Sequence, residues 1–480
     1  MNRKRLIVKT AVLVVSGALS MGFAHGADTV VSVTLSPQSP GVTIPADFVG
    51  ISYEGRILLP DAAGGHFLTQ SNTPLLTMFR TLGVKSIRVG GNSSELFDVN
   101  PTDADRTGLF NFARTAGISV IFNLRTKTST GVGANPNNEP QQVAIASTIL
   151  RDHSDVLQAF ELANEPDSSM TWSVYKGLID KVLADIAKQP NGTKARYTGP
   201  SATSGAVSTF PGNFAKAYAL RGDIKFVSQH WYPAGDRNSV TDVVAKRAEM
   251  LNTATMHAKY SAFYDKFVPA VTGQNLRYRL EETNSLASGG KEEVSDTYTA
   301  SLWMLDYMHW WATRSALGVN VHSGQNTVDK PNFYTAITPA VRSSTYTARP
   351  VAYGMKAFDL GGHGRVVPVQ LSSGSLDMNA YGVLGSDGSL YVTLINKSFG
   401  SGASNAKVTI NPGAIYAAGQ VWLMQAPANN IAAKTGMTLG GAAILGDGTW
   451  SGAPGAVPHG TGQSFTITVP PASAAVVKLK

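Results

Sequence analysis

Residues 157–166, LQAFELANEP, contain the clearest strand end of the chain. The first six of these residues form a mostly apolar run that is typical of a buried strand, and the polar sequence Asn164-Glu165-Pro166 follows it. Residues 172–187 then show the apolar spacing of an amphipathic helix. A buried strand, a short polar segment and a helix together make one unit of a parallel α/β fold.

The same unit recurs through residues 46–345. Eight strand-like runs alternate with helix-like stretches there, which predicts an α/β fold of the (β/α)8 TIM barrel type. An open, doubly wound sheet is the alternative, although no Gly-x-Gly-x-x-Gly fingerprint follows the first run. The expected strands are 48–53, 86–89, 119–124, 157–162, 196–198, 224–231, 275–282 and 318–321, and the clearest helices are 74–82, 143–152, 172–187, 240–260 and 295–316.

Residues 346–480 have a different pattern. Helical periodicity fades, and short alternating or β-branched runs are separated by Gly, Ser, Pro and Asn. This region is predicted to form a C-terminal antiparallel β-sandwich. Residues 27–45 are also strand-like, and we expect them to join that sandwich.

The first 26 residues have the pattern of a secretory signal peptide. Arg3, Lys4, Arg5 and Lys9 precede an uncharged apolar stretch, and Ala24-His25-Gly26 offers small residues for cleavage. The apolar stretch is short for a spanning helix, so a retained anchor is the weaker alternative. We therefore expect export to the periplasm or the medium, with no membrane attachment after cleavage.

Composition excludes several classes of function. The chain has no cysteine, so it has no disulfide, thiolate metal site or thiol nucleophile. The formal charge is +8, but the signal segment holds four of the basic side chains, and no dense basic run follows it. A nucleic-acid partner is therefore not expected. No metal-binding His motif or Gly-x-Ser-x-Gly elbow occurs, and we expect neither a metal nor a cofactor.

Two glutamates carry the functional prediction. Glu165 follows the fourth expected strand, and Glu282 ends the seventh. Catalytic groups of TIM barrels lie at these C-terminal strand ends, and two carboxyls in one pocket can act as an acid and a nucleophile in glycoside hydrolysis. Alternation along the seventh strand places Glu282 with Leu280 on one face. Glu281 falls on the other face, where we expect it to be an ion-pair partner.

Further polar side chains follow other strands. Glu54 ends the first strand and Asn92 follows the second, so both are candidates to bind sugar hydroxyls. His230 and Tyr232 end the sixth strand. Either of these two could hold Glu282 in its ionised state by donating a hydrogen bond.

These motifs resemble those of a known enzyme family. Asn164-Glu165-Pro166 and Glu282 resemble the barrel glycosidases that use glutamates after strands four and seven. Residues 160–166 and 280–290 resemble, more narrowly, the β-glucuronidase and heparanase family, glycoside hydrolase family 79, and particularly a bacterial β-glucuronidase. Residues 86–94 and 229–232 resemble further motifs of that family. The resemblance covers nearly the whole chain after residue 26.

The resemblance implies a retaining exo-β-glucuronidase that acts on carbohydrates with a terminal β-linked glucuronic acid. Glu165 would be the acid/base and Glu282 the nucleophile, with the carboxyls roughly 5–5.5 Å apart. Asn164 would bind the sugar 2-hydroxyl, and the amides of Gly289 and Gly290 with Tyr334 would bind the sugar carboxylate. An endo-acting heparanase-like enzyme, a glycosidase for neutral sugars and a noncatalytic carbohydrate-binding barrel remain alternatives.

Overall fold

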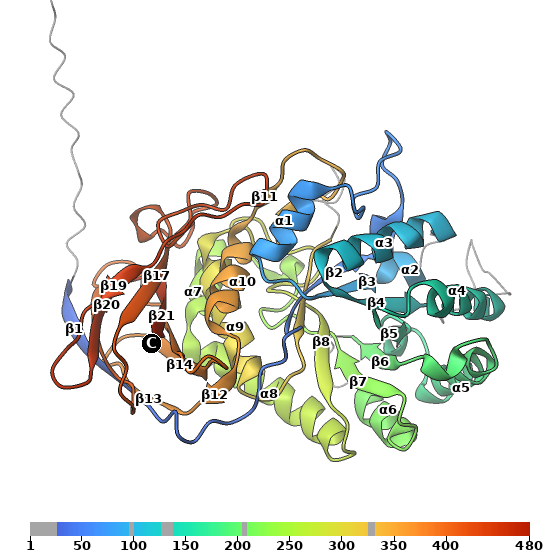
Figure 1. The fold of residues 1–480 in the computed structure, drawn as a ribbon, viewed down its shortest axis with the longest axis horizontal. Helices are drawn as coiled ribbons and strands as arrows, with labels where there is room; N and C mark the ends of the chain where they lie inside the picture. The colour runs from blue at the N-terminus through green and yellow to red at the C-terminus, as the bar shows by residue number, and fades with distance from the viewer. Residues whose placement is uncertain (1–25, 96–99, 126–137, 204–208, 325–331) are drawn as a thin grey trace, which may run out of the picture.

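The computed structural model describes residues 26–95, 100–125, 138–203, 209–324 and 332–480. A barrel and a β-rich part lie side by side (Figure 1). The predicted signal segment lies outside the described residues, except for Gly26, where the first strand begins.

The first part is a closed barrel of eight parallel strands, which confirms the predicted TIM barrel. Each of the eight predicted runs contains or overlaps one barrel strand. The open-sheet alternative is wrong, because the first and last of these strands pair with each other. The strands are β2 (Val49–Glu54), β3 (Ser86–Gly90), β4 (Ser119–Leu124), β5 (Leu157–Leu162), β6 (Tyr197–Ala202), β7 (Ile224–Gln229), β8 (Tyr278–Thr283) and β9 (Val319–His322).

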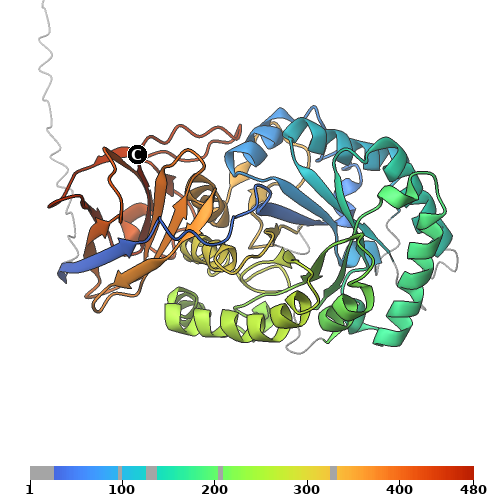
Figure 2. The same cartoon turned by 60° about the horizontal axis from the view of Figure 1, so that its bottom comes forward.

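Helices surround the barrel (Figure 2). The single helix predicted over residues 240–260 is two helices, because Asn252 ends α7 and its side chain caps α8 by accepting a hydrogen bond from the Thr255 N–H. Within the described residues, no helix is both long and apolar enough to cross a membrane. The helices are α1 (Thr73–Thr81), α2 (Asn92–Glu95), α3 (Asp103–Ala116), α4 (Asn138–Asp152), α5 (Trp172–Ala187), α6 (Phe210–Tyr218), α7 (Val243–Leu251), α8 (Thr253–Thr272), α9 (Tyr298–Ala312) and α10 (Pro350–Gly361).

Helix α10 lies beyond residue 345, where the sequence predicts the sandwich to begin. The sequence does not indicate this helix, because Gly354, Gly361 and Gly362 lower its helix propensity. Gly354 has a packing reason: a Cβ there would lie 2.4 Å from the Ser301 carbonyl oxygen of α9. The two helices pack closely, so every residue of α9 is buried.

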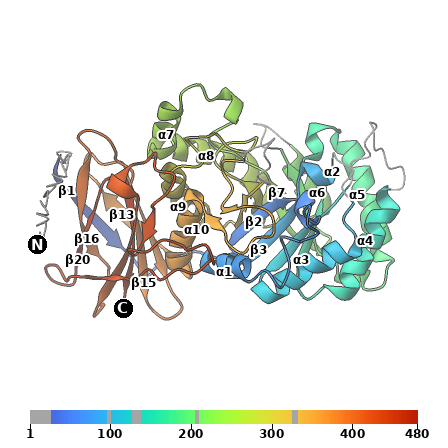
Figure 3. The same ribbon diagram turned by 90° about the horizontal axis from the view of Figure 1, so that it is seen from above.

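The second part consists of two packed sheets with their own apolar core (Figure 3). Strand β1 belongs to the four-stranded sheet, where it pairs antiparallel with β13 and parallel with β16. One pairing is thus parallel in a sandwich predicted to be antiparallel. The whole barrel separates β1 from its neighbours in sequence, so no hairpin fixes its direction.

The strands of the two packed sheets are β1 (Gly26–Leu35), β12 (Arg365–Val367), β13 (Val369–Ser372), β14 (Met378–Leu384), β15 (Leu390–Asn396), β16 (Ser404–Asn411), β17 (Gly419–Gln425), β18 (Thr438–Leu439), β19 (Gly455–Val457), β20 (Phe465–Val469) and β21 (Ser473–Leu479). A separate short pair is formed by β10 (Ile337–Thr338) and β11 (Thr347–Ala348).

A buried ion pair joins the barrel to the sandwich. The Lys397 Nζ of the sandwich lies 2.9 Å from the Asp306 carboxylate of α9, and both side chains are almost fully buried. His257 and the Tyr381 hydroxyl also contact that carboxylate, at 3.0 and 2.6 Å. Burial alone would raise the pKa of Asp306, but Lys397 and His257 outweigh it and hold the pKa well below its usual range. The ion pair therefore contributes to docking the two parts.

Candidate active site

The two predicted glutamates meet at the mouth of the barrel. One carboxylate oxygen of Glu165, one of Glu282 and a ring nitrogen of His230 all lie within 4.8 Å of one another. Retaining glycosidases keep their two carboxyls roughly 5–5.5 Å apart, whereas inverting enzymes leave about 6.5–9.5 Å for a water. The observed spacing fits the retaining arrangement.

The backbone at Glu165 is held in an uncommon conformation. Ala163 and Glu165 have φ values of 77° and 48°, in the left-handed region that non-glycine residues rarely adopt. Two hydrogen bonds secure this turn: the Glu165 N–H donates to the Ser201 carbonyl at 2.9 Å, and the Asn164 N–H donates to Glu95 at 3.0 Å. The strand end is thereby shaped to direct Glu165 into the mouth.

Glu282 is held in its ionised form. The Arg88 Nη1 donates to one carboxylate oxygen at 2.6 Å, and the Tyr232 hydroxyl donates to the other at 2.7 Å. Burial alone would raise the pKa of Glu282, but His322, His230, Arg88 and the Tyr232 hydrogen bond outweigh it and hold the pKa well below its usual range. A charged, oriented carboxylate is what a nucleophile requires.

His230 contacts the other glutamate. Its Nδ1 lies 3.1 Å from Glu165 Oε1 and 3.8 Å from Glu282 Oε2. Burial lowers the pKa of His230, but Glu282 and hydrogen bonds with Glu161 and Glu165 outweigh it and raise the pKa to about 10. Of the two residues predicted to support Glu282, Tyr232 thus makes the hydrogen bond, and His230 supplies charge nearby.

Sequence reasoning missed Arg88, which connects the site. Arg88 lies on β3 with no exposed surface, and the Glu161 carboxylate binds its guanidinium through both oxygens, at 2.7 and 2.8 Å. Its remaining N–H groups donate to Asn164 at 2.6 Å, Glu282 at 2.6 Å and Ser52 at 3.3 Å. A charged residue inside an apolar strand was the available signal, since such residues are buried only when paired.

The residues predicted to bind sugar hydroxyls, Glu54 and Asn92, lie near Asn164. The Asn164 amide receives the Arg88 bond and donates to Asn92 at 3.2 Å. Glu54 accepts a hydrogen bond from the Ser93 N–H at 2.7 Å and lies 3.7 Å from His322 Nε2. These contacts bring Glu54, Asn92 and Asn164 to one rim of the mouth.

Gly289, Gly290 and Tyr334 form a second group of candidates, and the Tyr334 ring lies 5.8 Å from the ring of His322. The Phe333 N–H donates to the Gly289 carbonyl at 2.6 Å, and a Cβ on Gly290 would lie 3.0 Å from the Tyr334 nitrogen. The N–H groups of the two glycines donate to no other group in the described part of the chain. The Tyr334 ring stacks on that of Tyr232, with centroids 6.1 Å apart. This group therefore offers two backbone amides beside a tyrosine that stacks on Tyr232, the hydrogen-bond donor to Glu282.

Two expectations for β8 are wrong. Glu281 makes no ion pair within 4 Å among the described residues; instead it accepts a hydrogen bond from Ser201 at 3.0 Å inside the barrel. Simple alternation would place Glu282 on the same face of β8 as Leu280. Its carboxylate instead points into the mouth of the barrel, where it binds Arg88 and Tyr232. The pairing of β8 with β9 shifts register between Leu280 and Thr283, and this irregularity breaks the simple alternation.

Glu165, His230 and Glu282 are close enough together to suggest a metal site. Their surroundings favour another use. Arg88 already neutralises Glu282, and the raised pKa of His230 keeps its ring protonated, so a cation would meet two positive groups. The three side chains suit proton transfer and charge stabilisation better than metal ligation.

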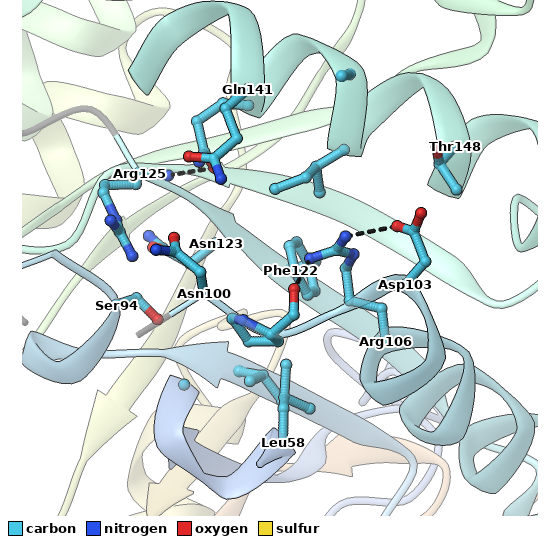
Figure 4. A pocket seen from close by; sticks show the side chains of 16 residues that line it. Leu58, Ser94, Asn100, Asp103, Arg106, Phe122, Asn123, Arg125, Gln141 and Thr148 are labelled. Atoms are coloured by element: carbon cyan, nitrogen blue, oxygen red, sulfur yellow. Dashed lines mark hydrogen bonds and ion pairs between the residues drawn. The ribbon is translucent and has the colours of Figure 1, made fainter. Parts of the chain in front are cut away.

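A cavity of about 250 Å³ lies between η1 (Gly55–Leu58), β4, α3 and α4 (Figure 4), and its lining includes neither Glu165 nor Glu282. Asn123, at the end of β4, lines it and is 5% exposed. Among the described residues, neither polar atom of the Asn123 side chain has a hydrogen-bond partner. A buried, unsatisfied amide that faces a cavity is suited to bind a polar ligand group. Sequence reasoning missed Asn123 as well.

No protein-family model matches the chain, and no curated protein matches it in sequence. Solved structures match nearly its whole length. A 4-O-α-L-rhamnosyl-β-D-glucuronidase from Fusarium oxysporum 12S has a TM-score of 0.69 and 18% identity over 95% of this chain and 99% of that one. A GH51 arabinofuranosidase from Xanthomonas axonopodis pv. citri has a TM-score of 0.65 and 14% identity, covering 94% and 100%.

The GH family 44 endoglucanase Cel44A from Clostridium thermocellum has a TM-score of 0.64 and 12% identity, again covering 94% of this chain and 100% of that one. These three enzymes differ in their substrates, and all share one architecture with this chain. The chain therefore has the fold of barrel glycoside hydrolases.

Proposed function

We propose that this protein is a retaining glycoside hydrolase in which Glu165 is the acid/base and Glu282 the nucleophile. The main support is the pair of carboxyls. One oxygen of Glu165 lies within 4.8 Å of one oxygen of Glu282, and Arg88 and Tyr232 hold Glu282 ionised. Glu282 would attack the anomeric carbon while Glu165 protonates the leaving oxygen. Glu165 would then deprotonate the water that releases the sugar from the ester.

The proposed substrate is a β-linked glucuronide, and the proposed mode is exo. The amides of Gly289 and Gly290 beside Tyr334 could bind the carboxylate of a uronic acid without an arginine. The motif resemblance to glycoside hydrolase family 79 supports the same sugar, as does the glucuronidase among the similar structures. Asn164, which Arg88 orients, would bind the 2-hydroxyl.

A second candidate is an endo-acting enzyme of the heparanase type. If a longer substrate runs from the mouth of the barrel past Asn123, the cavity of about 250 Å³ that this residue lines could hold a further sugar unit. A noncatalytic binding protein would not need the ionised carboxylate that Arg88 and Tyr232 maintain.

Hydrolysis of p-nitrophenyl β-D-glucuronide, beside the neutral glucoside and xyloside, tests this function. The proposal predicts turnover of the glucuronide that Glu282→Gln and Glu165→Gln both abolish. Preference for a neutral glycoside would refute the proposed specificity for glucuronides. Turnover of glucuronide oligosaccharides but not of the aryl glucuronide would favour the endo candidate. Binding without any turnover would refute the enzyme assignment.

We also propose that the protein is exported after removal of residues 1–26. The basic start and the uncharged stretch at residues 11–23 support this proposal. N-terminal sequencing of the protein recovered outside the cytoplasm tests it, since an intact Met1 would contradict cleavage.

A further inference from the structure

The barrel interior holds a carboxyl that the mechanism above does not use. Glu281 precedes Glu282 on β8 and has no exposed surface. The Ser201 hydroxyl donates to its Oε2 at 3.0 Å, and its Oε1 has no hydrogen-bond partner in the described part of the chain. A buried carboxylate with so few partners is costly, so its protonation state requires an explanation.

The nearby guanidinium groups donate hydrogen bonds to groups other than Glu281. A guanidinium has five N–H groups, and those of Arg88 donate to Glu161, Glu282, Asn164 and Ser52. On β8 itself, Arg279 donates to the Asn320 side chain and to the Leu317 carbonyl. It also donates to the carboxylate and to the backbone carbonyl of Asp47. These bonds use all five N–H groups of Arg88 and four of Arg279, and among the described residues neither guanidinium forms an ion pair with Glu281 within 4 Å.

The remaining charged neighbour that faces Glu281 is a second carboxylate. Glu161 of β5 is bound to Arg88, and His230, after β7, lies 3.8 Å from Glu161 and binds Glu165. Thr198 and Ser201 of β6 are neutral. Burial first, and then the charge of Glu161, raise the pKa of Glu281 to about 7, although Thr198, Arg88 and Ser201 oppose the rise.

Ser201 connects Glu281 to the acid/base. Its hydroxyl binds Glu281, and its carbonyl accepts the Glu165 N–H at 2.9 Å. Ser201 has a φ of 51°, a left-handed conformation that the surrounding contacts must hold in place. The carboxyl thus supports, through one residue, the strained turn that directs Glu165.

We propose that Glu281 carries a proton in the active enzyme and is a positioning residue for Glu165, so that its ionisation ends turnover at alkaline pH. Ionised Glu281 would attract Arg88, whose bonds to Glu282 and Asn164 would then weaken. This inference deepens the proposed function, and its kinetic test rests on that function.

The kinetic test uses an aryl glycoside with a very good leaving group, such as a dinitrophenyl glucuronide. Such a leaving group needs no proton from Glu165, so loss of the acid does not lower the rate at high pH. We expect wild-type kcat to fall about tenfold one pH unit above the Glu281 pKa. Glu281→Gln, which stays neutral, should keep the acid-side kcat and abolish this fall, whereas Glu281→Ala should lower kcat at every pH with little change in KM.

A matched control is Glu249→Gln on α7, whose carboxylate binds Lys246 and Lys259 at the surface. This variant should retain the wild-type pH profile. An alkaline fall that persists in Glu281→Gln would overturn the inference, as would a folded Glu281→Gln with no activity at any pH.

An infrared titration tests the protonation without any turnover. Wild-type protein should show a protonated carboxylic C=O band that disappears near neutral pH and is missing from Glu281→Gln. Absence of this band from wild-type protein would overturn the inference, even if Glu281→Gln failed to fold. A band present in a protein that hydrolyses no glycoside would instead refute the proposed function and leave the buried proton established.

Discussion

Replacing Arg88 with lysine tests how far one buried guanidinium organises the site. Lysine keeps the positive charge but has three N–H donors in place of five, so at least two of the five hydrogen bonds are lost. Hydrogen bonds to charged groups contribute about 1.5–3 kcal/mol each. Arg88→Lys should therefore lower the free energy of unfolding by about 3–6 kcal/mol.

The same change should slow catalysis. A lysine cannot bind both oxygens of Glu161 and still reach Glu282 and Asn164, so the candidate nucleophile and the 2-hydroxyl ligand lose their alignment. We expect kcat to fall by at least about tenfold, which corresponds to about 1.4 kcal/mol in the activation free energy. Hydrolysis of the aryl glucuronide measures this loss.

Urea unfolding followed by tryptophan fluorescence measures the stability, because Trp303, Trp310 and Trp311 are buried in α9. Arg114→Lys is the control, since Arg114 pairs with Asp155 at the surface, where both side chains are about half exposed. The control should change stability by no more than about 0.5 kcal/mol. An Arg88→Lys protein within about 1 kcal/mol of wild type, with unchanged kcat, would refute the central role of the guanidinium.

Three further changes have defined outcomes. Tyr232→Phe removes a donor to the ionised nucleophile, so the acid limb of kcat/KM should move up by about one pH unit; an unmoved limb would contradict this role. Lys397→Met leaves Asp306 buried without its cation and should cost about 3–5 kcal/mol in urea unfolding, whereas Lys478→Met at the surface should cost little. Because the folded pKa of Glu281 is raised to about 7, wild-type stability should fall as pH rises from about 4.5 to 7. Glu281→Gln should therefore be more stable by about 3 kcal/mol above pH 7 in thermal or urea unfolding, and equal stability there would contradict the raised pKa.

The strand pattern was predictable because barrel strands are buried on both faces. Runs such as residues 119–124 are therefore mostly apolar, and they stand out between polar turns. Helix α10 was not predictable in this way, since its glycines lower its intrinsic helix propensity, although Gly354 allows close contact with Ser301 of α9.

The glutamates of the site were predictable from their positions at strand ends, and so was the hydrogen bond from Tyr232 to Glu282, but the buried network around them was not. Arg88, Glu161 and Ser201 come from different strands, and only closure of the barrel brings them within hydrogen-bonding distance. Alternation also failed at Glu282, because the local register shift in β8 cannot be read from a single strand. Strand ends therefore reveal the candidate acid and nucleophile, while the network that sets their charges requires the three-dimensional structure.

In the proposed mechanism, Glu282 forms a covalent ester with the sugar. Incubation with 2-deoxy-2-fluoro-β-D-glucuronosyl fluoride, followed by intact-mass measurement and peptide mapping, tests it directly, with the corresponding glucosyl fluoride as a neutral comparison. The account predicts one added fluoroglucuronosyl group per chain, attached to Glu282 and absent from Glu282→Gln. A label on Glu165, or no label from either fluoride, would contradict it.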